Sequence, residues 1–241
     1  MVRVNEAAVW HDVECGAYDA DLELWSELAV AARGPVLELG AGTGRVALHL
    51  AGQGLPVTAL DSDAQLLAEL SRRARSRGLE LPCVQFDARE RLPCGFALII
   101  APMQFLQVLG GDDRRAALLA RVREALSPGG RFAAALTEVD VAVAHEEAGP
   151  PHPDVAERDG WIYSSLPLDV RPEPAGLAVE RLRQRVSPTG ELSEERSTIV
   201  LESLSMESLA RELAAHGLTV VERHAIPATP DHVGSEVAVC A

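Results

Sequence analysis

The stretch Val36-Leu37-Glu38-Leu39-Gly40-Ala41-Gly42-Thr43-Gly44 decides the fold, because a short apolar strand runs directly into a glycine-rich turn. Apolar residues then recur with helical spacing, so we expect a helix from Thr43 to Gln53. A tight turn between a strand and a helix lets a ligand approach the backbone closely. The sequence therefore predicts an α/β sheet with a ligand at the end of its first strand.

Strand-like and helical stretches alternate on both sides of this turn, up to residue 137. The expected strands are Val36–Leu39, Pro56–Leu60, Pro82–Phe86, Phe96–Ala101 and Phe132–Leu136, and the expected helices are Asp21–Arg33, Thr43–Gln53, Asp63–Arg77 and Asp112–Leu126. Alternation of this kind gives parallel strands joined by right-handed crossovers. The predicted fold class is α/β, a doubly wound and mostly parallel sheet.

The pattern changes in the second half of the chain. His145–Asp159 is rich in Pro, Asp, Glu and His and is predicted to be a loop or lid. An antiparallel insertion is expected next, and a last helix with two strands completes a seven-stranded sheet; these elements are Trp161–Val170, Leu177–Val186, Glu194–Leu204, Met206–His216, Leu218–His224 and Glu236–Cys240. The expected regions are a helical cap (1–34), a cofactor-binding core (35–138), a lid with the insertion (139–205) and the completing elements (206–241).

The composition excludes several partners. The 241 residues carry a net charge of −14, and all 22 basic residues are Arg. An acidic surface repels phosphate chains and anionic lipid, so we expect neither a nucleic-acid nor a membrane partner. We find no signal peptide and no apolar stretch near the ~20 residues that span a bilayer, and we expect a cytoplasmic protein.

The cysteines do not form a recognisable framework. The chain has four cysteines, Cys15, Cys83, Cys94 and Cys240. No two of them form a Cys-x-x-Cys motif, and no two histidines have the spacing of metal ligands. We expect reduced thiols and no metal site.

The glycine motif alone leaves two cofactor classes open. Gly42 to Ala47 also fits the dinucleotide pattern G-x-G-x-x-G/A, and Asp61 lies near the acidic position of that pattern. Glu38, however, lies two residues before Gly40. A carboxylate there suits a cofactor with an amino group and a sulfonium, and it is a poor neighbour for an anionic pyrophosphate.

An ordered set of segments resembles the class I S-adenosylmethionine-dependent methyltransferases. The segments are Val36–Ala51, Val57–Leu67, Phe86-Asp87-Ala88, Ala97–Leu109 and Leu126–Leu136. The resemblance implies that S-adenosylmethionine is the cofactor and that its methyl group moves by in-line displacement to a nitrogen, oxygen or carbon nucleophile.

The resemblance also implies roles for individual residues. The cofactor contacts that it implies are Tyr18, Glu38, Gly40, Ala41, Gly42, Gly44, Asp61, Ser62, Leu66, Asp87, Ala88, Ala101 and Gln104. Among these, Asp61 would hold the ribose hydroxyls, Ser62 and Leu66 would flank the adenine, and Asp87 would accept from its amino group. Tyr18 and Trp10 would close over the cofactor.

The acceptor is predicted to be a small molecule. After the fourth strand the chain reads Ala101-Pro102-Met103-Gln104, which is not the Asn/Asp-Pro-Pro-aromatic box of enzymes that methylate nucleic-acid bases or glutamine amides. A base is needed only if the acceptor is protonated. The candidates, among which the sequence does not choose, are His145, Tyr163 and His232, followed by His152 and Glu138.

Two other functions remain open at this point: an NAD(P)-dependent oxidoreductase, and a non-catalytic protein that binds S-adenosylmethionine. The chain could be a monomer or a homodimer. We expect Trp25 in the core and Arg45 on a helix surface, although Arg45 could instead reach the cofactor carboxylate. The alternating Arg181, Arg183 and Arg185 are expected on a solvated strand face.

Overall fold

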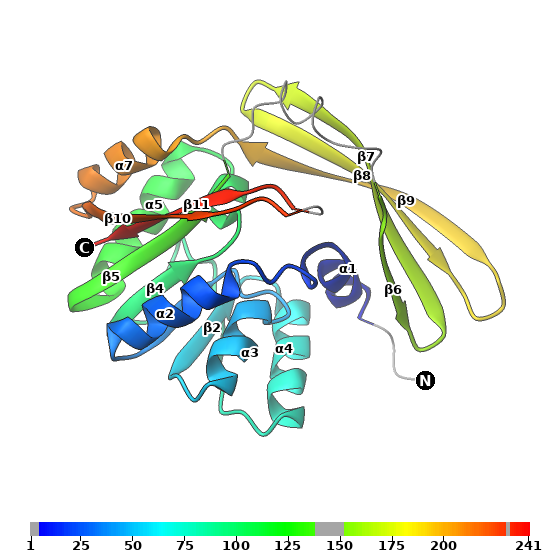
Figure 1. Cartoon of the computed structure of the whole chain (residues 1–241), viewed down its shortest axis with the longest axis horizontal. Coiled ribbons are helices and arrows are strands. Elements are labelled where there is room, and N and C mark those ends of the chain that lie inside the picture. Colours follow the sequence, from blue (N-terminus) through cyan, green and yellow to red (C-terminus); the bar gives the residue numbers. More distant parts are fainter. Residues whose placement is uncertain (1–4, 138–151, 230–231) are drawn as a thin grey trace. The chain divides into compact units, whose positions relative to one another are not determined.

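The computed structural model describes residues 5–137, 152–229 and 232–241 (Figure 1). Its internal contacts divide the chain into two compact units. The core unit contains residues 18–138 and 204–241, and the insertion unit contains residues 1–17 and 139–203. The first residues of the chain therefore share a unit with a segment that follows much later in the sequence.

The core unit is built on a seven-stranded sheet with the strand order β10-β11-β5-β4-β1-β2-β3. The strands are β1 (Val36–Leu39), β2 (Val57–Asp61), β3 (Cys83–Gln85), β4 (Phe96–Ala101), β5 (Leu126–Leu136), β10 (Val220–Ile226) and β11 (Ser235–Cys240). The first five are parallel where they pair, whereas β11 pairs antiparallel with both β5 and β10. The predicted fold class is confirmed.

Helices cover both faces of this sheet (Figure 1). The core-unit helices are α2 (Leu22–Ala32), α3 (Arg45–Gly52), α4 (Ala64–Ser76), the short 3₁₀ helix η1 (Phe105–Val108), α5 (Asp112–Ala125) and α7 (Met206–Ala215). One buried cluster joins the sheet to α2, α3 and α4 through Trp25, Val46 and Leu70. A second joins it to α5 and α7 through Leu119 and Leu209. Trp25 is a core residue, as predicted.

The strand order reverses beside β1. The chain winds from β1 outward to β2 and β3, then crosses back and continues through β4 to β5 on the other side. In open parallel sheets, ligands bind in the crevice at the carboxyl ends of the strands where the order reverses. The turn after β1 and the turn after β4 both lie at this edge.

The insertion unit pairs one helix with a four-stranded antiparallel sheet. Its elements are α1 (Glu6–Cys15), β6 (Asp154–Arg158), β7 (Trp161–Glu173), β8 (Gly176–Val186) and β9 (Leu192–Glu202). Helix α1 packs on β6 and β7. Val9, Trp10 and Val13 of the helix form a buried cluster with Tyr163.

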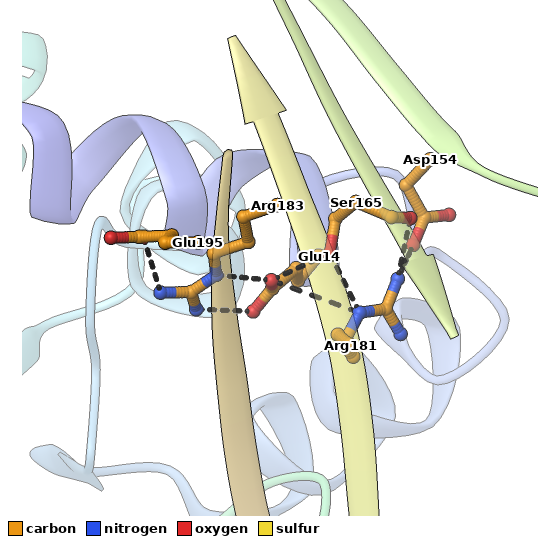
Figure 2. A network of polar contacts seen from close by, with 6 residues as sticks. All are labelled: Glu14, Asp154, Ser165, Arg181, Arg183 and Glu195. Carbon is orange, nitrogen blue, oxygen red and sulfur yellow. Dashed lines mark hydrogen bonds and ion pairs between the residues drawn. The ribbon is translucent and has the colours of Figure 1, made fainter. Parts of the chain in front are cut away.

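Two expectations about this unit are wrong. Part of the predicted loop His145–Asp159 forms strand β6, because residues 154–158 pair antiparallel with β7, and alternate residues of the strand are half-buried. The face of β8 with Arg181, Arg183 and Arg185 is not simply solvated, since acidic residues of α1 pair with it. Glu6 pairs with Arg185. Figure 2 shows the ion pairs of Glu14 with Arg181 and Arg183.

The remaining differences concern element ends. Strand β5 begins at Leu126, directly after α5, and its pairing with β4 is irregular between Leu126 and Arg131. Helix α1 lies within the region predicted as a helical cap (1–34), but no separate helix was predicted at its residues. Within the described residues, no helix is both long enough and apolar enough to cross a bilayer.

Candidate functional site

Three glycines shape the turn from β1 into α3. The backbone φ angle is +65° at Gly40, +55° at Gly42 and +95° at Gly44. Residues with a side chain adopt this left-handed region only at a cost. Gly40 also lacks room, since a Cβ atom there would lie 2.5 Å from Cδ2 of Phe105, just after β4. The predicted glycine-rich turn is therefore present at the reversal of the strand order.

Asp61, the last residue of β2, holds this turn in place. Its Oδ2 accepts a hydrogen bond from the Gly42 N–H at 2.8 Å, and its Oδ1 accepts from the Asp63 N–H at 2.9 Å. The Ala41 N–H donates to the Leu60 carbonyl at 2.9 Å. Each carboxylate oxygen can accept a second hydrogen bond. Asp61 thus lies beside the glycines, and its contact with a ribose stays a prediction.

Glu38 is buried inside β1, with 3% of its surface exposed. Within the described part of the chain, its Oε2 has no hydrogen-bond partner. Burial raises the pKa of Glu38 to about 8, against the effects of the Arg45 charge and the Ala47 backbone N–H, while Asp21 and Asp61 add to the increase. A buried acceptor without a partner is costly, and a cationic group of a ligand would satisfy it. The residues present therefore fit a positively charged cofactor.

A buried ion pair lies close to Glu38. Arg45 Nη2 donates to Asp21 Oδ2 at 2.8 Å, and Trp25 Nε1 donates to the same oxygen at 2.8 Å. Only 11% of the Arg45 side chain and 1% of the Asp21 side chain are exposed. The expectation that Arg45 lies on the helix surface is therefore wrong. Sequence reasoning missed Asp21, although its position at the N-cap of α2, four residues before Trp25, could have indicated the hydrogen bond from the Trp25 indole.

Tyr18 and His232 are brought together in the core unit. Their ring centroids are 4.9 Å apart, and the Arg45 guanidinium carbon lies 5.0 Å from the Tyr18 centroid. Tyr18 is 7% exposed, and burial raises its pKa. His232 lies between β10 and β11, and β11 starts opposite the end of β5 at Leu136. Arg45 thus links Tyr18 to the glycine-rich turn, while a base role for His232 stays a prediction.

The residues predicted around the adenine follow β2 and β3. Ser62 is exposed and Leu66 is half-buried in the first turn of α4. The N-cap of this helix is Asp63, whose Oδ1 accepts from the Gln65 N–H at 2.7 Å. Ser62 is consequently not needed as the cap, and both predicted adenine neighbours lie at the same edge as Asp61.

Asp87 already has a partner within the chain. Its Oδ1 accepts from the Arg89 backbone N–H at 2.9 Å and from Arg89 Nε at 2.8 Å. The side-chain hydrogen bonds from Arg89 lower the pKa of Asp87 to about 2. Ala88, which lies between Asp87 and Arg89 in the sequence, is buried. Sequence reasoning missed Arg89, and an adenine amino group would have to share the Asp87 carboxylate with it.

The turn after β4 is held by Thr137, the last described residue after β5. Gln104 Nε2 donates to Thr137 Oγ1 at 3.0 Å. Gln107 Nε2 donates to the Thr137 carbonyl at 2.9 Å, and its Oε1 accepts from the Thr137 N–H at 2.8 Å. Ala101, at the end of β4, is buried, and Met103 in the turn that follows has a left-handed φ of +54°. We call Gln104, Gln107 and Thr137 the Thr137 clasp; only Gln104 was predicted from the sequence.

The other candidate residues lie elsewhere or outside the described residues. Tyr163 is 2% exposed and packs edge-on against Trp10 with ring centroids 5.3 Å apart, both within the insertion unit. Trp10 is 6% exposed in this packing, and its closing over the cofactor stays a prediction. His152 is exposed in the same unit. His145 and Glu138 lie outside the described residues.

Comparison with known families bears directly on this site. Residues 36–130 match the family model of the methyltransferase domain. This interval starts at β1 and contains the glycine-rich turn, Asp61 and the turn after β4. Residues 36–130 thus form a methyltransferase domain, and the fold is that of the class I S-adenosylmethionine-dependent methyltransferases, whose cofactor is S-adenosylmethionine.

Solved structures of low sequence identity share the fold over nearly the whole chain. The sugar N-methyltransferase KedS8 from Streptoalloteichus sp ATCC 53650 is 17% identical, with a TM-score of 0.72 and coverage of 96% of this chain and 90% of its own. The amino pentose methyltransferase CalS10 from Micromonospora echinaspora is 19% identical, with a TM-score of 0.69 and coverage of 100% and 98%. The glycopeptide N-methyltransferase MtfA, complexed with S-adenosylmethionine, is 26% identical, with a TM-score of 0.57 and coverage of 90% and 86%. No curated protein sequence matches the chain.

Proposed function

We propose that this methyltransferase transfers its methyl group to a nucleophile on a small molecule, and that an amino group on a sugar is the acceptor class to test first. The observation that carries the proposal is the buried Glu38 of β1, whose Oε2 has no hydrogen-bond partner among the residues that the structure describes and which lies two residues before Gly40. This supports a cationic cofactor at the reversal of the strand order, where an acceptor could approach the turn after β4.

Three observations support a small-molecule acceptor. The net charge of −14 disfavours a phosphate chain. The segment Ala101-Pro102-Met103-Gln104 lacks the box of base- and glutamine-methylating enzymes. Among the solved structures of similar fold, KedS8 is a sugar N-methyltransferase and CalS10 an amino pentose methyltransferase.

We also propose that residues 139–205 contribute the acceptor selectivity. The family match ends at residue 130, so this segment lies outside the part of the chain that resembles the methyltransferase domain. A segment outside the shared cofactor-binding fold can differ between enzymes without loss of cofactor binding. Replacement of this segment should therefore change the preferred acceptor and leave the affinity for S-adenosylmethionine within about twofold.

The chain contributes binding and orientation more than chemistry. Bound S-adenosylmethionine supplies a methyl group on a positively charged sulfur, which suits in-line displacement. Holding reactants in line can contribute ~7 kcal/mol or more to lowering the barrier. A protonated amine must lose its proton before it can attack. His232, whose ring packs against Tyr18, is the described residue that we propose to test for this step.

A methyl-transfer screen tests the proposal. The protein is incubated with methyl-labelled S-adenosylmethionine and panels of amino sugars, other amines, phenols and carboxylic acids, with Glu207→Gln, an exposed change on α7, as the control variant. We expect transfer to amino sugars at rates above all other panels, by wild type and control alike. Cofactor binding without transfer to any panel would instead support a non-catalytic binding protein. Binding of a nicotinamide cofactor without binding of S-adenosylmethionine would support an oxidoreductase.

A further inference from the structure

Glu38 faces an excess of negative charge from the elements packed around it. The charged groups that act on it are Arg45 at the start of α3, Asp21 before α2 and Asp61 at the end of β2. One of the three is positive and two are negative, and Arg45 is already paired with Asp21 through two hydrogen bonds. An ionised Glu38 would add a third carboxylate to this set of charged groups, which contains a single guanidinium.

While no cationic ligand is bound, the neutral acid is the form of Glu38 with the lower free energy. Among the described residues Oε2 is buried without a hydrogen-bond partner, and the Ala47 backbone N–H is the backbone donor to this carboxyl. A buried charge that is not compensated costs far more free energy than a buried neutral carboxylic acid. Burial and like charge both favour the protonated form. The pKa of about 8, raised chiefly by burial, agrees with this geometric argument.

We propose that Glu38 is a neutral acid in the cofactor-free enzyme and releases its proton to solvent when S-adenosylmethionine binds. The O–H bond of the carboxylic acid breaks, the proton leaves to the buffer, and both electrons of the bond stay on the carboxylate. S-adenosylmethionine carries a sulfonium, an ammonium and a carboxylate, so its net charge of +1 compensates the new negative charge. The proposal rests on cofactor binding and is independent of the acceptor.

The proposal predicts a proton count and a pH slope for binding. At pH 6.5, nearly all Glu38 is protonated in the free enzyme, so binding should release about one proton. The association constant should rise about tenfold from pH 6 to pH 7. Over this range the ammonium of the cofactor keeps its proton, because α-amino groups titrate near pH 7.7–8.0.

Titration calorimetry with S-adenosylmethionine in two buffers of different ionisation enthalpy measures the count. We expect about one proton for wild type, the same for the control Glu207→Gln, and none for Glu38→Gln, in which the amide mimics the neutral acid. Melting curves show whether Glu38→Gln folds; if it does not, the wild-type count and pH slope still decide. Binding without proton release between pH 6 and pH 7, or equal release by Glu38→Gln, overturns the proposal alone. Absence of any binding overturns the cofactor assignment as well.

Discussion

A residue can be required to be glycine by a positive φ angle or by lack of room for a side chain, and comparison of Gly40 with Gly54 distinguishes these two reasons. Both have positive φ angles, +65° and +79°. A Cβ atom at Gly40 would lie 2.5 Å from the Phe105 ring, whereas at Gly54 no atom of the described residues, apart from the glycine and its chain neighbours, lies within 4 Å of one. We therefore expect Gly54→Ala to lower the free energy of unfolding by about 1 kcal/mol and Gly40→Ala by about 2–4 kcal/mol. Urea unfolding measures both, and equal losses would show that Phe105 moves aside freely.

The sequence could indicate Glu38 and Asp61 but not the residues that support them. A carboxylate beside a glycine-rich turn is a local pattern, and it was visible in the chain. The burial of Arg45 depends on Asp21, which is 24 positions away and belongs to another helix end. Such a pair has no local signature, because the compensation for burying each charge comes from the fold.

The Thr137 clasp ties two elements together at the carboxyl edge of the sheet. Gln107 of η1 is 3% exposed, and its amide pairs with both backbone groups of Thr137 after β5. Gln107→Leu removes both partners and should lower the free energy of unfolding by about 2–4 kcal/mol. The control Gln104→Leu removes only the hydrogen bond to Thr137 Oγ1 and should cost about 1 kcal/mol. Denaturant unfolding of the two variants tests the difference, and similar losses would contradict it.

A helix or strand could be predicted from sequence where the pattern of its own residues is enough to determine its structure. Strand β4 is apolar throughout because the sheet is covered on both faces, and its bounds were predicted correctly. Helix α1 was missed because its buried residues, including Trp10 and Val13, form a short stripe whose partner Tyr163 lies far along the chain. Strand β6 was missed because it is short and mostly polar, so it reads as a loop until β7 is beside it.

At the scale of the whole molecule, the insertion unit is held together across its two sequence segments by Glu14. Arg183 Nε and Nη2 donate to the two Glu14 oxygens at 2.7 and 2.8 Å, and Ser165 Oγ donates to Oε1 at 2.8 Å (Figure 2). Burial by itself would raise the pKa of Glu14, but the hydrogen bonds from Arg183 and Ser165 and the arginine charges outweigh it, so the pKa lies below its usual value. The ionised form of Glu14 therefore stabilises the folded unit.

Glu14→Gln should lower the stability of α1 against local opening, whereas Glu6→Gln on the same helix should leave this stability nearly unchanged. Glu14 and Arg183 are 17% and 22% exposed, while Glu6 and Arg185 are 55% and 34% exposed. We expect the opening free energy from hydrogen exchange of the α1 amides to fall by about 1–3 kcal/mol in Glu14→Gln and by less than about 0.5 kcal/mol in Glu6→Gln.

The lowered pKa of Glu14 also predicts that the stability of α1 depends on pH. Since the folded pKa of Glu14 lies below the usual 4.5, its contribution is complete well above pH 4.5 and disappears as the pH falls through the folded value. The difference in opening free energy of the α1 amides between wild type and Glu14→Gln should accordingly decrease as the pH falls from 6 to 3. A difference that stays constant over this range would mean that the shape of the side chain, and not its charge, holds α1 on the antiparallel strands.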